Sequence, residues 1–396
     1  MAERSKALDW KFSNIFTGVR GFESHPLRHI NPISARSVSS DAVDARRPDS
    51  VVTVRMLRIV PVALILVACA PAEPVELRGS AMGTTWTVTL EGALDDTDIA
   101  RAENVIDEVL ADVDATLSTW NPGSEISSLN RRTRTDWIAS SDALYTVLAA
   151  AKAVNRESSG AFDVTVAPSV ALWGFGADAR SGSPSEQDLA QARSLTGPDA
   201  FELRAGPNAV RKAASGVRFD VDAIAPGYAV DRISDELSAL GFEDHIVEIG
   251  GEVRCRGRGP GGRAWRVAVE RPRAGVRTIQ AVVALDGLGI STSGDYRDFR
   301  VSEGRRIAHA IDPRTGRPVT HPLASVSVVH ESVMLADAYA TALMVLGPEQ
   351  GYALAERLEL PVLLVTRTTG GFAVRVTPSF ARLQVGDAGL PHGAHN

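Results

Sequence analysis

Hydrophobic and polar positions along the chain follow the two periods that strands and helices require. Residues 84–91 alternate and are rich in Thr and Val, which predicts a strand. Apolar side chains recur every three or four positions from Ile99 to Leu117, which predicts an amphipathic helix capped by Thr97 or Asp98. The same criteria predict helices at 141–154, 228–240, 331–346 and 348–358, and strands at 217–221, 245–249, 252–256, 264–270 and 279–285.

Turn residues mark where several of these elements end. Ser141 is the predicted cap of the second helix, and Gly241 and Gly347 follow the ends of two others. Segments 362–366 and 372–376 flank a Gly-Gly pair, which predicts a terminal hairpin. Because hairpins pair antiparallel strands, we predict an α+β fold with antiparallel sheets and packed helices rather than a doubly wound parallel sheet.

An apolar run near the N-terminus is typical of a signal sequence. Residues 59–68 follow Arg55 and Arg58, and the run is too short to cross a bilayer as a helix. It ends in Leu-Val-Ala before Cys69, which looks like a bacterial lipobox with Cys69 as the lipidated residue. The alternative is a short buried helix with an incidental cysteine.

This interpretation divides the N-terminal part of the chain into three segments. Residues 1–55 are polar without a clear period, and we interpret them as a mis-called or unstructured leader ahead of a true start at Met56. Residues 56–68 are then a lipoprotein signal peptide and 69–75 a short tether. A diacylated cysteine supplies the two acyl chains that stable membrane attachment needs.

Composition excludes several classes of protein. The 396 residues are 44% hydrophobic and 23% charged, which is the range of a globular protein and excludes disorder over most of the chain. The net charge of −6 argues against a dedicated nucleic-acid binder. With only Cys69 and Cys255 present, a disulfide scaffold and a cysteine-ligated zinc site are both excluded.

Residues 257–262 match the dinucleotide-binding pattern G-x-G-x-x-G. That pattern requires a helix directly after it, whereas 264–270 alternates as a strand. We therefore interpret 257–262 as a hairpin turn.

Asp337 and Thr341 lie four residues apart on a predicted helix and so share one face. A carboxylate and a hydroxyl suit a hard cation such as Mg²⁺, which takes oxygen ligands and leaves room for phosphate. The alternative is a helix cap or a solvated Asp.

Three further clusters carry candidate chemistry. His309 stands before an Asp-Pro-x-x-Gly turn, where it could act as a general base or be an ordinary core or surface histidine. Residues 219–228 run from a strand through a small-residue turn into a helix, which favours an anion at the helix start but also fits a plain capped turn. Residues 289–296 are rich in hydroxyls and glycine and could bind phosphate or ribose, or form a polar turn.

Together these clusters resemble one family. The motifs occur in the family's order at 81–84, 118–120, 162–168 with 172–176, 220–231, 249–252, 291–296, 309–316 and 336–341. The chain resembles the ApbE-type FAD:protein FMN transferases over about residues 76–380, with 381–396 as a frayed tail. The resemblance implies an α+β fold whose two lobes form one catalytic unit, with FAD between them.

The resemblance also implies roles for particular residues. Met82 would lie at the adenine side of FAD, Trp120 would pack on FAD, and Ile311 would touch the flavin. His309 and Asp337 would be catalytic, with His309 close to the reacting centre. The remaining FAD contacts would come from Ala161, Phe162, Asp163, Asp220 and the position of Pro226. Mg²⁺ would be bound by Asp337, Thr341 and the carbonyl of Ala223.

The activity implied is a Mg²⁺-dependent transfer of FMN from FAD to a Thr or Ser hydroxyl of an acceptor redox protein, with release of AMP. The partners implied are an acceptor flavoprotein subunit with a Ser/Thr flavinylation motif and, through Cys69, the membrane. The enzyme would be lipid-anchored on the extracytoplasmic face of a bacterial cell envelope. A Mg²⁺-dependent FAD pyrophosphatase and a flavin-binding lipoprotein without catalysis remain as alternatives.

One position departs from the family's pattern. Where the family commonly has Lys, this chain has Pro226, which cannot make a polar side-chain contact and lacks a backbone N–H. Arg232 or Arg297 could take over that contact. The departure bears on FAD affinity more than on the metal site.

Overall fold

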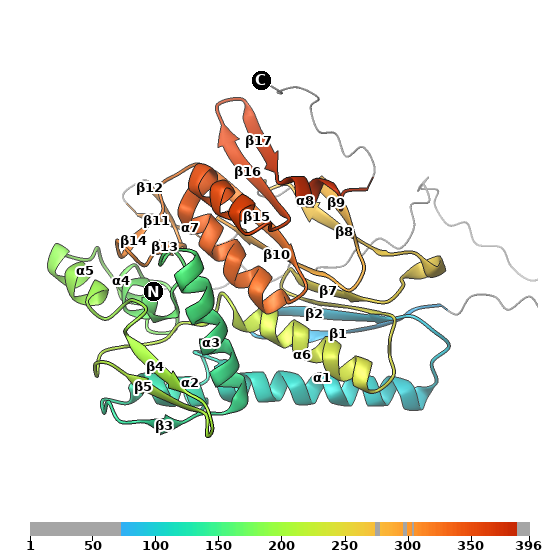
Figure 1. Ribbon diagram of the computed structural model, residues 1–396, viewed down its shortest axis with the longest axis horizontal. Coiled ribbons are helices and arrows are strands. Elements are labelled where there is room, and N and C mark those ends of the chain that lie inside the picture. Colours follow the sequence, from blue (N-terminus) through green and yellow to red (C-terminus); the bar gives the residue numbers. More distant parts are fainter. Residues whose placement is uncertain (1–72, 274–277, 296–298, 303–304, 386–396) are drawn as a thin grey trace, which may run out of the picture. The chain divides into compact units, whose positions relative to one another are not determined.

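The centre of the fold is an eight-stranded sheet in which every neighbouring pair of strands is antiparallel (Figure 1). The computed structural model describes residues 73–273, 278–295, 299–302 and 305–385. In spatial order the strands are β1 (Val75–Ala81), β2 (Thr84–Leu90), β6 (His245–Ile249), β7 (Glu252–Arg256), β10 (Gly289–Gly294), β15 (Leu323–His330), β16 (Val362–Thr368) and β17 (Gly371–Val376). The α+β fold class is confirmed.

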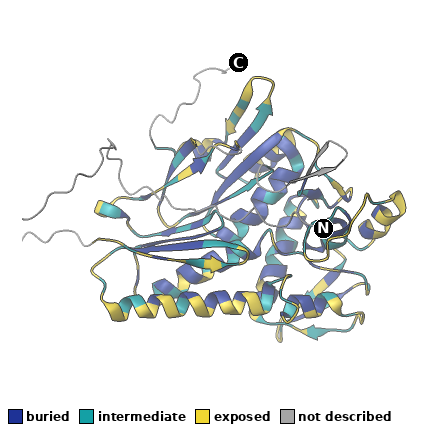
Figure 2. Cartoon of the chain, turned by 180° about the vertical axis from the view of Figure 1, so that it is seen from behind, coloured by how far each residue is buried: buried dark blue, intermediate teal, exposed yellow. Residues whose placement is uncertain are grey.

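Helices cover one face of this sheet. The helix α7 (Val333–Arg357) packs on β10 and β15, α6 (Ala225–Ala239) packs on β6, β7 and α7, and α1 (Asp96–Leu117) packs along α6. A fourth helix, α3 (Asp142–Glu157), contacts α1 and α7. Their apolar stripes and the inward positions of the strands form one continuous core, while the outer side of α1 is exposed (Figure 2).

A second apolar cluster lies on the opposite face of the sheet. Successive residues of a strand point to opposite faces of the sheet. Val328 therefore belongs to the helix-covered core, and Val329 belongs to the second cluster. The hairpin of β8 (Trp265–Glu270) and β9 (Ile279–Leu285) and the short helix α8 (Pro378–Ala381) supply the cover.

The C-terminal end of the described chain, up to Val385, is hydrogen-bonded to the β8–β9 hairpin. The N–H of Val385 donates to the carbonyl of Val282 at 3.0 Å, and the N–H of Ala284 donates to the carbonyl of Leu383 at 2.9 Å. Residues 381–385, which the prediction assigned to the tail, therefore pack with the rest of the fold, and 386–396 lie outside the described residues.

Smaller elements form the part of the fold beside α3. They are α2 (Glu125–Arg131), β3 (Ile138–Ala139), η1 (Val164–Val166), α4 (Ala167–Leu172), α5 (Glu186–Arg193), β4 (Phe201–Arg204), β5 (Ala209–Lys212), β11 (Phe299–Ser302), β12 (Arg305–Ala308), β13 (Ile311–Asp312) and β14 (Arg317–Pro318). The strands β3, β5 and β4 make a small antiparallel sheet, and β11–β12 and β13–β14 pair as hairpins.

The start of α7 is fixed by a carboxylate from α6. Asp231 accepts hydrogen bonds from the N–H groups of Val333 and Met334, each at 3.0 Å, and from the hydroxyl of Ser332 at 2.8 Å. These bonds satisfy N–H groups that a helix start leaves unpaired. They also fix where the candidate site residues on α7 lie relative to α6.

Three predictions from the sequence were wrong in detail. Residues 217–221 form no strand. The N–H of Phe219 donates to the side-chain oxygen of Asn130 at 2.7 Å, and the carbonyl of Phe219 accepts from the Asn130 amide at 2.8 Å. Both backbone groups of Phe219 are therefore bonded to a side chain instead of to a neighbouring strand. Asp95, not Thr97 or Asp98, caps α1 by accepting from both of their N–H groups at 2.9 Å. Residues 257–262 join β7 to β8, which belong to different sheets, so they do not form a hairpin turn.

The helix break at Gly347 is confirmed. Gly347 has φ +81° inside α7, and Pro348 begins the second part. Among the described residues, no helix combines the length and apolarity needed to cross a membrane. The predicted leader, the signal peptide and Cys69 lie outside the described residues.

Candidate functional site

Asp337 lies buried where α7 passes the start of α6. Its side chain is 5% exposed, and its Oδ2 accepts the N–H of Gly227 in the first turn of α6 at 3.4 Å. The hydroxyl of Ser291 on β10 lies within hydrogen-bonding reach of both Asp337 and Glu252 on β7, whose Oε1 is 3.4 Å away. Two sheet strands and two helices therefore meet at this carboxylate.

The surroundings of Asp337 disfavour its negative charge. Burial, and next the neighbouring charge of Glu252, raise the pKa of Asp337 well above its ordinary value. Hydrogen bonds from Gly227 and Ser291 act in the opposite direction but do not outweigh these causes. A cation bound here would remove the repulsion between the carboxylates, so the site favours binding of a positive charge.

The other predicted metal ligands lie on the adjoining turns. Thr341 follows one helical turn after Asp337, and its Oγ1 is 3.1 Å from the hydroxyl of Ser293. Ala223 is half-buried in the turn that precedes α6. No group of three or more His, Cys, Asp or Glu side chains suited to a metal occurs in the part of the chain that the structure describes. The donors available are thus a carboxylate, a hydroxyl and a backbone carbonyl, which are oxygens of the kind that Mg²⁺ accepts.

Two carboxylates occupy the turn before α6. The N–H of Asp222 donates to Oδ1 of Asp220 at 3.0 Å. Burial, together with the charge of Asp222, raises the pKa of Asp220 to about 7. The charge of Asp222 also contributes to the raised pKa of Asp337, which shows that this turn and Asp337 share one electrostatic environment.

Trp120 and Met82 are large apolar side chains left in solvent. Trp120 is 65% exposed, and its indole N–H donates to Oδ2 of Asp222 at 3.3 Å. Met82 is 38% exposed and has φ +53° in the turn from β1 to β2. That turn lies beside Gly250, where an added Cβ would stand 3.1 Å from the Thr84 side chain. Exposed apolar surface of this kind is available to a ligand.

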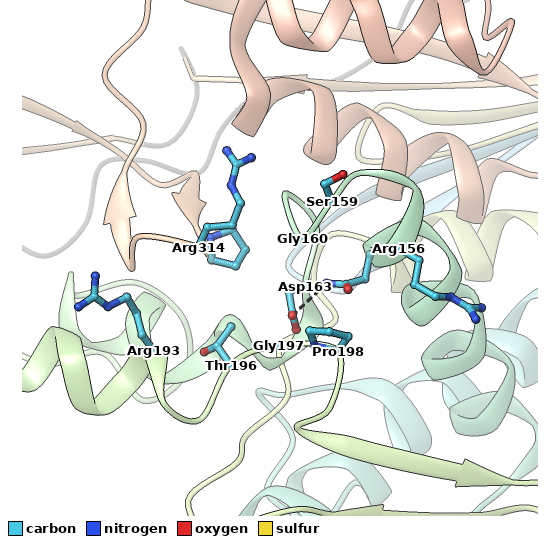
Figure 3. A pocket seen from close by; sticks show the side chains of 11 residues that line it. Arg156, Ser159, Gly160, Asp163, Arg193, Thr196, Gly197, Pro198 and Arg314 are labelled. Carbon is cyan, nitrogen blue, oxygen red and sulfur yellow. Dashed lines mark hydrogen bonds between the residues drawn. The ribbon is translucent and has the colours of Figure 1, made fainter.

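Gly160 and Asp163 border a cavity of about 410 Å³ (Figure 3). Figure 3 shows Arg314 on one side of this cavity and Gly197 and Pro198 on the other. Its volume falls within the range of small-molecule sites, although one of this size holds only part of a dinucleotide. The lining residues are Asn155, Arg156, Ser159, Gly160, Asp163, Arg193, Thr196, Gly197, Pro198, Pro313 and Arg314.

Of the three predicted FAD residues in this loop, only Asp163 lines the cavity. Ala161 and Phe162 are buried in the protein. The carboxylate of Asp163 accepts from the N–H of Thr165 at 2.8 Å and from the amide of Asn155 at 3.0 Å. Burial raises the pKa of Asp163, while the hydrogen bonds from Thr165 lower it. The carboxylate of Asp163 therefore holds its own loop in shape through these bonds.

The predicted turn after His309 is confirmed. His309 is half-buried in the bend between β12 and β13, and Ile311 is buried at the start of β13. The carboxylate of Asp312 holds Arg314 through two hydrogen bonds of 2.9 Å. An added Cβ on Gly160 would stand 3.6 Å from Cγ of Arg314, so the His309 turn and the 160–163 loop face each other.

Pro226 is the second residue of α6, where its fixed φ suits the first turn of a helix. Arg232 is paired with Glu236 at 2.6 Å, so its guanidinium is directed along α6. Arg297 lies outside the described residues. Sequence reasoning assigned no role to Asp222, Glu252 and Ser291, although each stood in a motif.

A model of the ApbE family matches residues 82–364. The chain belongs to the ApbE family. That range includes every site residue discussed above, from Met82 to Thr341.

The relatives and their structures agree with this membership. The chain is 38% identical over 319 residues to a protein of Vibrio cholerae named FAD:protein FMN transferase, a match that covers 80% of this chain and 95% of that protein. A Haemophilus influenzae protein of the same name is 37% identical, with 82% and 96% covered.

Solved structures show the same fold. The flavin transferase ApbE from Vibrio cholerae has a TM-score of 0.72 and 37% identity, covering 79% of this chain and all of that one. The apo form of the Pseudomonas stutzeri flavinyl transferase ApbE has a TM-score of 0.73 and 38% identity, covering 80% and 98%.

Proposed function

We propose that this ApbE protein transfers FMN from FAD to a Ser or Thr hydroxyl of an acceptor redox protein and releases AMP. The observation that carries the proposal is the buried carboxylate of Asp337 on α7, which contacts the start of α6. Burial and the charge of Glu252 both disfavour its negative charge. The family membership supports it, because the relatives that the chain matches over most of their length are named FAD:protein FMN transferase.

The metal in this proposal is Mg²⁺. Asp337, Thr341 and the carbonyl of Ala223 would hold it, since all three offer oxygen donors around the same helix starts. When bound, Mg²⁺ neutralises charge on the pyrophosphate of FAD and on the leaving phosphate. The raised pKa of Asp337 supports a cation site, because a cation reverses the cause of that shift.

The protein's own groups would position and activate the reactants. The oxygen of the acceptor hydroxyl would attack the phosphorus of the FMN half of FAD, and His309 would accept the proton of that hydroxyl. The pyrophosphate bond then breaks, and AMP leaves with the bridging oxygen. The cavity beside 160–163 would take one end of FAD, while Trp120 and Met82 would offer apolar surface to its rings.

We further propose that the enzyme acts on the extracytoplasmic face of a bacterial envelope, attached through a lipid on Cys69. The apolar run at 59–68 and the lipobox-like residues before Cys69 support this. Acceptors would then be membrane-bound or extracytoplasmic redox subunits that carry a Ser/Thr flavinylation motif.

One experiment separates the proposed reaction from its rivals. The purified protein is incubated with FAD and Mg²⁺, with and without an acceptor domain, and AMP and free FMN are quantified. Transfer predicts AMP that depends on the acceptor, without matching free FMN. A pyrophosphatase would release equal AMP and FMN without acceptor, and a flavin-binding lipoprotein would release neither.

A further inference from the structure

The turn that carries Trp120 has a fixed backbone but an exposed ring. The carbonyl of Ser118 accepts the hydroxyl of Ser124 at 2.6 Å, and the N–H of Asn121 donates to the hydroxyl of Ser118 at 3.1 Å. These bonds hold the main chain of the turn against the start of α2. Trp120 is nevertheless 65% exposed, so packing holds its ring only in part and a bonded group can set its orientation.

Asp222 is that group, because both of its carboxylate oxygens bond to this turn. Oδ1 accepts the hydroxyl of Thr119 at 3.0 Å, and Oδ2 accepts the indole N–H of Trp120 at 3.3 Å. The N–H of Asp222 donates to Asp220, so the carboxylate is itself held at the entry to α6. The contact joins residues 102 positions apart in the chain.

Asp222 makes charge-assisted bonds to this turn. Its two oxygens bond to a hydroxyl and an indole N–H, and a carboxylate acceptor makes such bonds stronger than a neutral one would.

We propose that Asp222 is a positioning residue that holds the ring of Trp120 in the orientation in which it receives an aromatic ring system of FAD. The inference rests on the proposed function, because it requires FAD to bind at Trp120. Fixing the indole before binding removes the cost of ordering it in the complex, which raises affinity without a new contact to the ligand.

A double-mutant cycle on FAD affinity tests this. FAD dissociation constants are measured by titration calorimetry in Mg²⁺ buffer, without acceptor, for the wild type, Asp222→Asn, Trp120→Phe and the double variant. Each single variant is expected to weaken FAD binding about five- to tenfold, because Trp120→Phe removes the indole N–H and Asp222→Asn replaces the charged acceptor with a weaker neutral one. The double variant is expected to bind FAD no more weakly than the weaker single variant.

Controls separate positioning from a general structural effect. Asp114 is an exposed carboxylate of the same region that accepts from the amide of Asn121 at 2.6 Å, so Asp114→Asn should leave FAD affinity unchanged. Turnover at saturating FAD is expected to fall less than twofold in Asp222→Asn, while its KM for FAD rises with the dissociation constant. The melting temperature should not change, since the contact lies at the surface.

Three results would overturn the inference. One is additive losses in the double variant, which would show that the two residues act independently. A second is weaker Mg²⁺ binding by Asp222→Asn with unchanged FAD affinity, which would make Asp222 a metal ligand. The third is a wild type that does not bind FAD, which would contradict the proposed function as well, whereas the first two leave that function standing.

Discussion

Asp337 on α7 and Gly227 on α6 are joined by a hydrogen bond from the Gly227 N–H to Asp337 Oδ2 at 3.4 Å. The two helices approach so closely here that a Cβ on Gly227 would lie 2.5 Å from the carbonyl oxygen of Val333. Glycine is therefore required by the contact between the helices. The same contact places a buried carboxylate at the positive end of α6.

Gly227→Ala should destabilise the protein by about 1–3 kcal/mol, because the added methyl group forces α6 and α7 apart. It should also weaken Mg²⁺ binding, since it moves Asp337 relative to the turn at Ala223. Urea denaturation and calorimetry measure the two effects. Gly370→Ala is the matched control, because nothing lies within 4 Å of its added Cβ. Equal stability of the two variants would contradict the close packing described here.

Asp337→Asn should abolish Mg²⁺-dependent turnover while leaving the fold intact. The amide has the same shape but removes a buried charge that Glu252 disfavours, so stability without metal should not fall. Thermal melts with and without Mg²⁺ provide the measurement. The wild type should gain stability from Mg²⁺ by mass action, and the variant should not. A variant that Mg²⁺ stabilises as strongly as it does the wild type would exclude Asp337 as a ligand.

His309→Ala should slow FMN transfer and spare FAD binding, because the proposed base acts on the acceptor hydroxyl and not on FAD. A loss of about 10²–10⁴-fold is the ordinary contribution of such a base. Single-turnover kinetics with saturating FAD and acceptor isolate the chemical step from binding. Transfer at the wild-type rate would remove His309 from the mechanism.

His245 should make stability fall in acid. It is fully buried between Ser234 and the carbonyl of Phe242, and burial lowers the pKa of His245 to about 4. An unfolded histidine titrates near 6.5, so the unfolded state binds the extra proton first as the pH drops. The contribution of His245 to the free energy of unfolding is therefore complete above about pH 6.5. It is lost between pH 6.5 and pH 4, by up to about 1.4 kcal/mol per pH unit.

Urea denaturation at pH 7 and pH 5 measures this loss. The raised pKa values of Asp220 and Asp337 act in the opposite direction, so the comparison must be made against a variant. His245→Gln should lose less stability than the wild type between the two pH values. Equal losses would show that His245 is not the group responsible.

The sequence predicted the elements whose own residues carry a period. The helices at 99–117 and 141–154, and the hairpin around Gly370, appear because their apolar faces are continuous in the chain. The two-residue strand β3 was missed, since it exists only through pairing with β5, which lies far along the chain. The false strand at 217–221 had the right pattern, but Asn130 took its hydrogen bonds.

The candidate site divides in the same way. The spacing of Asp337 and Thr341 on one helix was visible in the sequence, and the helix is confirmed. The sequence did not show that Glu252 and Ser291 lie close to each other. Their proximity follows from the pairing of β7 with β10, in which Ile290 lies opposite Val253. The contact of Asp222 with Trp120 likewise depends on how the start of α6 meets the end of α1.

Transfer of FMN to a protein changes the mass of the acceptor, so that mass is the first quantity to measure. The purified protein is mixed with FAD, Mg²⁺ and an acceptor domain that carries a Ser/Thr flavinylation motif, and the acceptor is weighed intact. We expect an added FMN phosphoester that disappears without Mg²⁺ and when the acceptor hydroxyl is replaced, as in a Thr-to-Val acceptor. An unmodified acceptor, in a reaction where FAD is nevertheless consumed, would contradict it.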